Sequence, residues 1–200
     1  MHATRRRCTA ESASLAARGY ALPPSMSRRA AAALLITRRD GRDLEVLLCA
    51  RSPELRFFGG YHALPGGTLA PEDWQAAGRD VGDDDVDALQ ACARRELFEE
   101  TGLVVHDLPP ARRTTASLRL ARTALLARER ASMERKKAGG AEPEVAEASP
   151  FLALVAGAAS PPLRELCRIE TPPFAPVRYD TVFVHVPLER CTASTHESGG

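Results

Sequence analysis

Three features that would indicate a protein class at once are absent from this sequence: paired cysteine motifs, an excess of one charge, and a long apolar run. The five cysteines are odd in number and never spaced as C-x-x-C, which argues against a disulfide framework and a zinc site. The net charge of +1 gives no reason to expect nucleic acid or an anionic membrane as partner. No apolar run approaches the roughly 20 residues of a membrane span. We therefore expect a soluble cytoplasmic protein; its oligomeric state is left open.

The first 29 residues are basic, with a single acid, Glu11, against six arginines. Serine and alanine are also frequent there, a composition shared by organelle transit peptides and by frayed tails. We expect a flexible basic tail over residues 1–29, followed by one domain over residues 30–190. Residues 191–200 are expected to form a second tail.

Apolar and turn-forming residues alternate along the first half of the domain. Ala30–Ile36 and Leu44–Cys49 are apolar and flank Asp40-Gly41, which predicts two strands joined by a hairpin. Residues 69–86 carry many acids and turn formers, and we interpret them as a mostly solvated insertion with a short helix around Trp74. A helix is expected from Asp87, which can cap it, to Gly102.

The second half predicts further elements of both kinds. Val104 and Val105 are expected to begin a strand, residues 118–137 and 151–156 to form helices, and residues 179–186 to form a late strand. Strands and helices without a regular βαβ repeat favour an α+β domain or a layered α/β/α domain with a mixed sheet.

Three carboxylates stand together near the end of the predicted long helix. Glu96, Glu99 and Glu100 follow the i, i+3, i+4 spacing that places side chains on one helix face. Their mutual repulsion is relieved when a divalent cation lies among them, because Mg²⁺ prefers hard oxygen ligands. A solvated acidic face is the alternative. Against it, Glu100 falls at the edge of the buried stripe that Leu97 belongs to.

The surrounding residues resemble a known family. Residues 95–103 spell R-E-L-F-E-E-T-G-L and match the second half of the Nudix box, R-E-U-x-E-E-x-G-U with U apolar, at every position. Pro65-Gly66-Gly67 precedes them, as in the family. The resemblance implies a Nudix fold, an α/β/α sandwich with a mixed sheet, and a hydrolase for a nucleoside diphosphate linked to another group.

By this resemblance, Glu96, Glu99 and Glu100 bind Mg²⁺ or Mn²⁺ together with the backbone carbonyl of Gly66. Arg95 orients the glutamates, and Glu96 or a metal-bound neighbour takes the proton of the attacking water. The catalytic residues implied are therefore Arg95, Glu96 and Glu99, and the general base stays open.

The first half of the box departs from the family pattern, which runs G-x5-E-x7 directly into the arginine. Here Gly67 is followed by the insertion of residues 69–86. Counted back from Arg95, the place of the usual glutamate falls on Asp87. Asp87 is a shorter acid, and we expect it to orient Arg95.

Residues upstream of the box resemble the coenzyme A subgroup of the family, L-L-T-x-R-[SA]-x3-R-x3-G-x3-F-P-G-G. Arg51, Arg56 and Gly67 keep their spacing, whereas Cys49 and Leu64 deviate. The subgroup implies that Arg51 and Arg56, with Gly67, bind substrate; guanidinium groups suit the phosphates of coenzyme A. A surface ion pair for Arg51 is the alternative interpretation.

The sequence leaves two other functions open. One is a Nudix pyrophosphatase for ADP-ribose or a dinucleotide, which would use the same metal helix. The other is a non-catalytic Nudix-fold binding module, or the N-terminal Nudix part of a larger protein. The chain ends soon after the late strand, without the closing helix of the family, which favours a truncated C-terminus.

Overall fold

The computed structural model of the chain describes residues 28–54, 59–80, 85–139, 149–172, 175 and 177–192. The predicted tail over residues 1–29 lies almost wholly outside these ranges, and so do Arg56 and residues 193–200.

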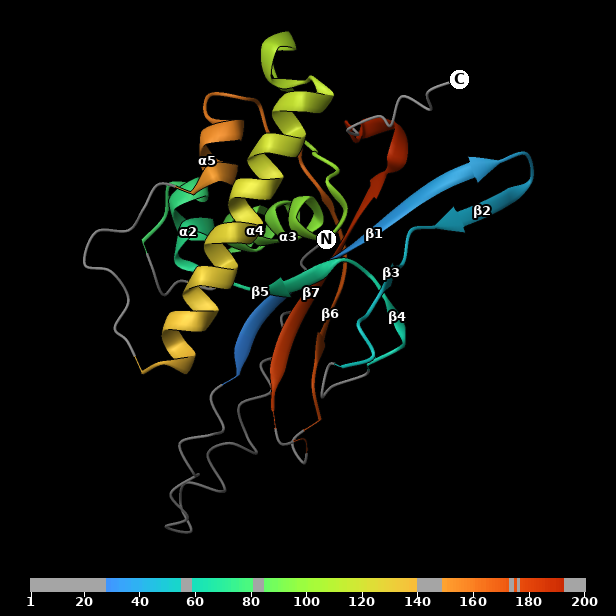
Figure 1. Ribbon diagram of the computed structural model, residues 1–200. Coiled ribbons are helices and arrows are strands. Elements are labelled where there is room, and N and C mark those ends of the chain that lie inside the picture. Colours follow the sequence, from blue (N-terminus) through green and yellow to red (C-terminus); the bar gives the residue numbers. More distant parts are fainter. Residues whose placement is uncertain are drawn as a thin grey trace.

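A mixed sheet forms the centre of the fold (Figure 1). Its central strand is β1 (Arg29–Asp40), which pairs in parallel with β7 (Tyr179–Pro187). Antiparallel partners of β1 are β2 (Asp43–Val46) and, along its first half, β5 (Gly66–Thr68). Strand β6 (Arg164–Glu170) lies antiparallel to β7 at the edge of the sheet. The predicted hairpin, late strand and mixed sheet are thereby confirmed.

The sheet is held by alternate side chains of its two central strands. Because successive side chains of a strand point to opposite faces, every second residue of β1 and β7 lies in one core. These residues are 3% exposed or less: Ala32, Leu34, Ile36, Val182, Val184 and Val186. Two short strands, β3 (Cys49–Ala50) and β4 (His62–Ala63), pair with each other in a separate small sheet.

Four α-helices are described: α2 (Pro71–Ala77), α3 (Val86–Thr101), α4 (Thr115–Lys137) and α5 (Pro150–Val155). Short 3-10 turns lie between α3 and α4 at Pro110–Arg112 and after β7 at Leu188–Arg190. Helix α3 begins after Asp85, whose carboxylate accepts the N–H of Asp87 at 2.6 Å, and ends at Gly102 with φ of 78°. Only glycine adopts this left-handed conformation without strain. The sequence predicts all four helices to within a few residues.

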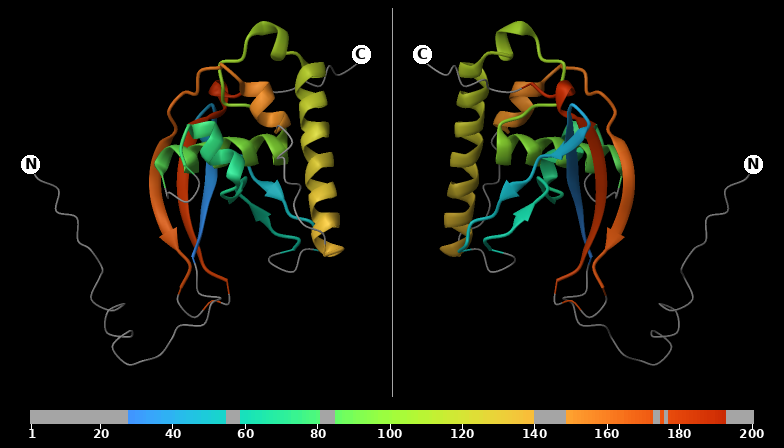
Figure 2. Two further views of the ribbon diagram at one scale, coloured as in Figure 1. Left: turned by 90° about the vertical axis from the view of Figure 1, so that its left-hand side faces the viewer. Right: turned by 90° about the vertical axis from the view of Figure 1, so that its right-hand side faces the viewer.

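Helix α3 packs directly on the sheet, and the other helices pack around it. Leu89, Ala93 and Leu97 are fully buried against β1 and β7, which confirms the predicted apolar stripe. Phe98 joins a second cluster that includes Phe151 of α5 and residues of α4. In both views of Figure 2 the helices lie to the same side of the sheet. The predicted α+β domain with a mixed sheet is thus confirmed, while a second helical layer is not seen among the described residues.

Two further features adjoin α3. Val104 and Val105 come just after it and are buried but form no strand, because only Val104 makes a single bridge, to Thr192. The predicted strand was wrong there.

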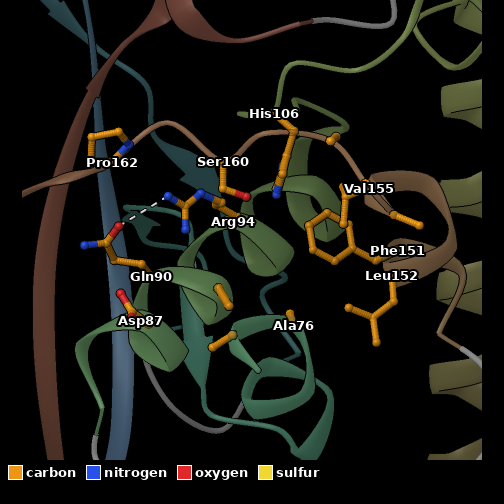
Figure 3. Close-up of a pocket in the computed structure, with 15 residues that line it drawn as sticks. Ala76, Asp87, Gln90, Arg94, His106, Phe151, Leu152, Val155, Ser160 and Pro162 are labelled. Carbon is orange, nitrogen blue, oxygen red and sulfur yellow. Dashed lines mark hydrogen bonds between the residues drawn. The ribbon is translucent and has the colours of Figure 1, made fainter. Parts of the chain in front are cut away.

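Helices α2, α3 and α5 enclose a pocket of about 490 Å³ (Figure 3). No helix of the described ranges is both long and apolar enough to cross a membrane.

Candidate active site

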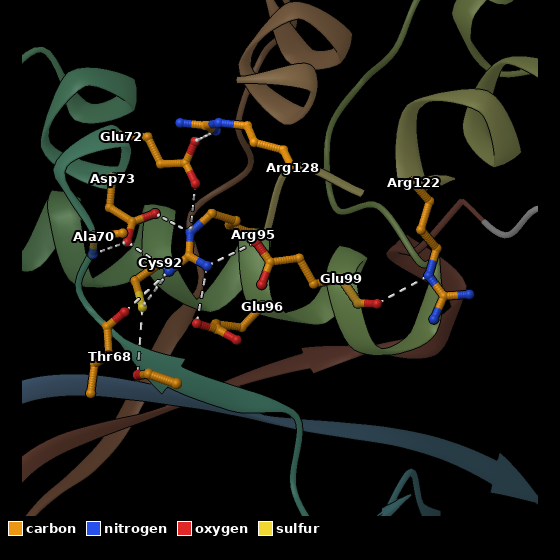
Figure 4. Close-up of polar contacts among 11 residues, drawn as sticks. Thr68, Ala70, Glu72, Asp73, Cys92, Arg95, Glu96, Glu99, Arg122 and Arg128 are labelled. Atoms are coloured by element: carbon orange, nitrogen blue, oxygen red, sulfur yellow. Dashed lines mark hydrogen bonds and ion pairs between the residues drawn. The ribbon is translucent and has the colours of Figure 1, made fainter. Parts of the chain in front are cut away.

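Arg95 is the centre of a buried polar network on α3 (Figure 4). Its guanidinium group is only 4% exposed and donates two hydrogen bonds to Asp73, from Nε at 2.9 Å and from Nη2 at 3.0 Å. A further bond goes to Glu99 Oε1 at 2.8 Å, and another to the carbonyl oxygen of Thr68 at 3.1 Å. This bidentate pairing with a carboxylate is the geometry that arginine provides and lysine does not.

The acid that orients Arg95 is Asp73, and the expectation for Asp87 was wrong. Asp87 is exposed and binds Arg79 at 2.7 Å. Asp73 is 1% exposed, and its Oδ2 also accepts the backbone N–H of Ala70 at 2.8 Å, so it fixes the start of α2. The segment after Gly67 is therefore not wholly a solvated insertion, since its first turn of helix contributes a buried part of the site.

The sequence did contain a signal for Asp73. Counted forward from Gly67, the family spacing of five intervening residues places the acid at Asp73. Counting backward from Arg95 selected Asp87 instead. The additional residues thus lie between Asp73 and α3, and the fold brings the two halves of the motif together across them.

Glu96 and Glu99 lie against Arg95, whereas Glu100 faces the glycine loop. Glu96 Oε1 is 3.0 Å from Arg95 Nη1. The backbone of Gly66 and the thiol of Cys49 lie near the carboxylate of Glu100 and lower its pKa, against the larger effect of burial. Arg122 of α4 binds the carbonyl oxygens of Glu99 and Glu100 at 3.0 and 2.9 Å, which satisfies acceptors left over at the end of α3.

The pKa values of all three glutamates are raised, chiefly by burial. Burial, followed by the opposing effects of Arg95 and the neighbouring carboxylates, raises the pKa of Glu96 to about 7 and that of Glu99 to about 9. Burial also raises the pKa of Glu100. Burial alone lowers the pKa of Arg95, but Asp73, Glu96 and Glu99 together raise it well above its ordinary value.

This donor set fits a divalent cation by chemistry, because buried carboxylate oxygens with raised pKa values gain most from a hard positive ion. As placed, the described residues contain no group of three His, Cys, Asp or Glu side chains that could hold a metal ion. Glu96 and Glu99 turn toward Arg95 and not toward Glu100. The assignment of Glu96, Glu99, Glu100 and the Gly66 carbonyl as metal ligands stays a prediction.

The two glycines of the loop each allow a close approach. A Cβ atom on Gly66 would overlap the backbone of β1 at Ala32 and Ala33. On Gly67, it would overlap the carboxylate of Glu96. Gly66 therefore lets β5 pair with β1, and Gly67 leaves room for a site glutamate.

Arg51 lies near the glutamates, as the motif spacing requires. Strands β3 and β4 hold its backbone: Arg51 N–H donates to the carbonyl of Tyr61 at 2.9 Å. Its positive charge lowers the pKa of Glu100, so the two charges are close enough to interact. Arg56 lies outside the described residues, and its role stays a prediction.

Two further basic residues, both from α4, belong to the site and were not predicted. Arg122 binds the two carbonyl oxygens at the end of α3. Arg128 binds Glu72 at 2.9 Å, and Glu72 lies 3.7 Å from Arg95. Their helix was predicted, but its side chains show no spacing that points to α3.

A family model agrees with this geometry. The NUDIX domain model matches residues 26–154, which include the glycine loop, Asp73 and all of α3. The chain belongs to the Nudix family. The expectation of a Nudix hydrolase on this fold is thereby confirmed.

A solved structure of a Nudix hydrolase agrees with the family at the level of fold. A Nudix hydrolase from Alicyclobacillus acidocaldarius shares 28% sequence identity, with a TM-score of 0.56 over 80% of this chain and 70% of that protein. The Nudix domain of Shewanella oneidensis NrtR, solved with ADP-ribose, shares 15% identity, with a TM-score of 0.41 over 92% of this chain and 76% of that one. A comparison with curated proteins gave no match.

Proposed function

We propose that this Nudix hydrolase cleaves coenzyme A or acyl-coenzyme A to 3′,5′-ADP and (acyl-)4′-phosphopantetheine. The observation that carries the proposal is Arg51. It stands where the coenzyme A motif has its first arginine, and it lies beside Glu100. A guanidinium at this place can meet a phosphate outside the scissile diphosphate, and coenzyme A has such a group at the 3′ position.

The reaction is a hydrolysis of one P–O–P bond. A water oxygen forms a bond to one phosphorus, the bridging P–O bond breaks, and the leaving phosphate carries the electron pair away. The proton of the water passes to a carboxylate on α3. Bound Mg²⁺ or Mn²⁺ supplies charge neutralisation of the diphosphate and acidifies the water.

The side chains of the chain position these groups. Arg95, fixed by Asp73, holds the carboxylates of Glu96 and Glu99 on α3. Gly67 leaves space beside Glu96, and the backbone of Gly66 lies near Glu100. A small-molecule nucleoside diphosphate derivative is therefore the expected partner of this site.

A substrate panel tests the proposal. Coenzyme A, dephospho-coenzyme A, ADP-ribose and a dinucleotide are incubated with the protein and Mg²⁺ or Mn²⁺, and the products are identified by ³¹P NMR. We expect the highest kcat/KM for coenzyme A or its acyl forms. Preference for ADP-ribose or a dinucleotide would replace the proposed substrate but keep the family chemistry. Binding without hydrolysis of any compound would favour a non-catalytic module.

The role of Arg51 is tested by comparing the loss of kcat/KM that its substitution causes on two substrates, with and without the 3′-phosphate. Arg51→Ala should lower kcat/KM for coenzyme A about ten- to a hundredfold more than for dephospho-coenzyme A, since one charge-assisted hydrogen bond is lost. Arg56→Ala is predicted to behave similarly. Arg38→Ala is the matched control, because Arg38 is exposed and pairs with Glu45 on the hairpin. Equal losses on both substrates would remove the 3′-phosphate role of either arginine.

A further inference from the structure

A pocket lies between α2, α3 and α5 (Figure 3), and Glu96, Glu99 and Glu100 are not among its lining residues. Its volume is about 490 Å³, within the range of small-molecule sites. Gln90, Ala91 and Arg94 line it from α3. At about 100° per residue, Arg94 projects roughly 200° around the helix from Glu96. The pocket and the active-site face therefore use opposite sides of the same helix.

Arg94 lines this pocket as a buried cation with neutral partners. It is 6% exposed, and its Nη2 donates to the carbonyl of Pro161 at 2.6 Å and to the side-chain oxygen of Gln90 at 3.2 Å. Its Nε is buried and has no hydrogen-bond partner, and no carboxylate of the described residues makes an ion pair with it. Burial lowers the pKa of Arg94 to about 10.

The neighbouring Arg95 shows what a satisfied buried arginine looks like in this protein. It is similarly buried but has a bidentate bond to Asp73 and ion pairs with Glu96 and Glu99. Buried charges in proteins are normally paired in this way. Arg94 differs because it makes no ion pair among the described residues, and Asp87 only partly offsets the effect of burial on its pKa.

His106 lines the same pocket with a second unsatisfied group. It is 7% exposed, its Nδ1 is buried without a hydrogen-bond partner, and its ring meets the edge of Phe151 at a centroid distance of 5.7 Å. Burial, and then the charge of Arg94, lowers its pKa to about 4. At neutral pH the imidazole is uncharged and can donate one hydrogen bond to an anion.

The remaining lining does not neutralise Arg94. Asp87 lies at the pocket but is engaged by Arg79 at 2.7 Å. Gln90 uses its side-chain oxygen for Arg94 and for the backbone N–H of Leu163. The other walls are mainly apolar and include Ala77, Phe151, Leu152 and Val155.

We propose that this pocket binds a small organic anion, whose carboxylate or phosphate meets Arg94 and His106 and whose apolar body lies against Phe151. The charge of Arg94 and the unsatisfied nitrogens of Arg94 and His106 would bind the anionic head group. The alanine, leucine and valine walls, together with the phenyl ring, specify the body. The site is separate from the diphosphate chemistry, so it stands or falls independently of the proposed substrate.

Binding is tested with three compounds that share one ring. Benzoate and phenyl phosphate carry the two head groups, and benzyl alcohol is the uncharged control. The full chain is titrated in buffer with EDTA, and the imidazole resonances of His106 and the ring resonances of Phe151 are followed by NMR. We expect saturable shifts with at least one anion at millimolar concentration and weaker binding of the alcohol; which anion binds tighter identifies the head group.

Two variants locate the bound anion. Arg94→Gln keeps polarity but removes the charge, and Ala77→Leu narrows the pocket while keeping Arg94. Each should weaken anion binding by about tenfold or more, the effect of losing a charge-assisted contact or the cavity. Arg38→Gln, remote from the pocket, should bind as the unchanged protein does. If Arg94→Gln fails to fold, Ala77→Leu decides.

Three results would overturn the proposal. The first is the absence of shifts at His106 and Phe151 with either anion. The second is equal binding of benzyl alcohol, which would leave an apolar cavity without anion recognition. The third is unchanged anion binding in Ala77→Leu.

Discussion

At the residue scale, the pairing of Arg95 with Asp73 decides how the two halves of the motif meet. Asp73→Asn should lower the free energy of unfolding by about 3 kcal/mol, because it leaves a buried guanidinium with a neutral partner. It should also lower kcat/KM, since Arg95 then holds Glu96 and Glu99 less firmly. Urea denaturation and steady-state kinetics measure the two effects.

Asp87→Asn is the matched control for this prediction. Asp87 makes only an exposed ion pair with Arg79, worth roughly 0–1 kcal/mol. A larger loss in Asp87→Asn than in Asp73→Asn would restore the assignment made by counting backward from Arg95.

Removing one glutamate charge should lower activity without lowering the stability of the fold. Glu99→Gln and Glu100→Gln are each expected to lower turnover by orders of magnitude while circular dichroism stays unchanged. Without metal, the free energy of unfolding should hold or rise, because burial raises the pKa of both carboxyls and neighbouring carboxylates raise that of Glu99 further. Activity should vanish with EDTA and return with Mg²⁺ or Mn²⁺. A folded variant with unchanged turnover at limiting Mg²⁺ would refute the metal assignment.

The adjacent glycines should respond differently to alanine. In Gly66→Ala the new methyl meets the backbone of β1, which cannot easily move, so the free energy of unfolding should fall by about 1–3 kcal/mol. In Gly67→Ala it meets the end of the flexible Glu96 side chain, so stability should change little while kcat/KM falls. Thermal unfolding and kinetics on both variants distinguish the cases; equal stability losses would contradict the expected difference.

At the element scale, the segment that follows α3 contributes a pH-dependent part of the stability. His106 has its pKa lowered from 6.5 to about 4 by burial and by Arg94. Between these values the unfolded chain binds a proton that the folded chain does not, so the free energy of unfolding falls as pH drops from about 6.5 toward 4. The loss amounts to about 2–3 kcal/mol.

His106→Gln tests this linkage. The difference in unfolding free energy between the unchanged protein and the variant is measured by urea denaturation across pH 4 to 8, which cancels the titration of the carboxylates. We expect the difference to shift in favour of the variant as pH falls. A difference independent of pH would show that His106 titrates normally.

Elements with a strong pattern were predicted, and those without one were not. Helix α3 has an apolar stripe, a capping aspartate and a terminal glycine, and β1 and β7 alternate against a core. By contrast, every residue of β6 is exposed, so no buried face imposes a period of two. Strands β3, β4 and β5 are two or three residues long, too short for a pattern to develop.

The site shows the same division between local and distant information. Glu96, Glu99, Glu100 and Arg95 lie within one helix, and a fixed helical repeat sets their relative directions. Asp73 reaches Arg95 from another helix, and its position depends on how the intervening residues fold back. The contributions of α4 depend wholly on packing, so no spacing in the sequence encodes them.

At the scale of the whole molecule, one strand pairing governs the order of events during synthesis. Strand β1 finds its parallel partner only in β7, and the first pair joins Arg29 to Tyr179, about 150 positions later. At about 5–20 residues per second, a ribosome needs roughly 10–30 s to cover that distance. Throughout this interval β2 and β5 can pair with one edge of β1, but the edge that β7 later occupies stays unpaired. The nascent chain therefore carries an open, aggregation-prone strand edge that a chaperone would have to shield.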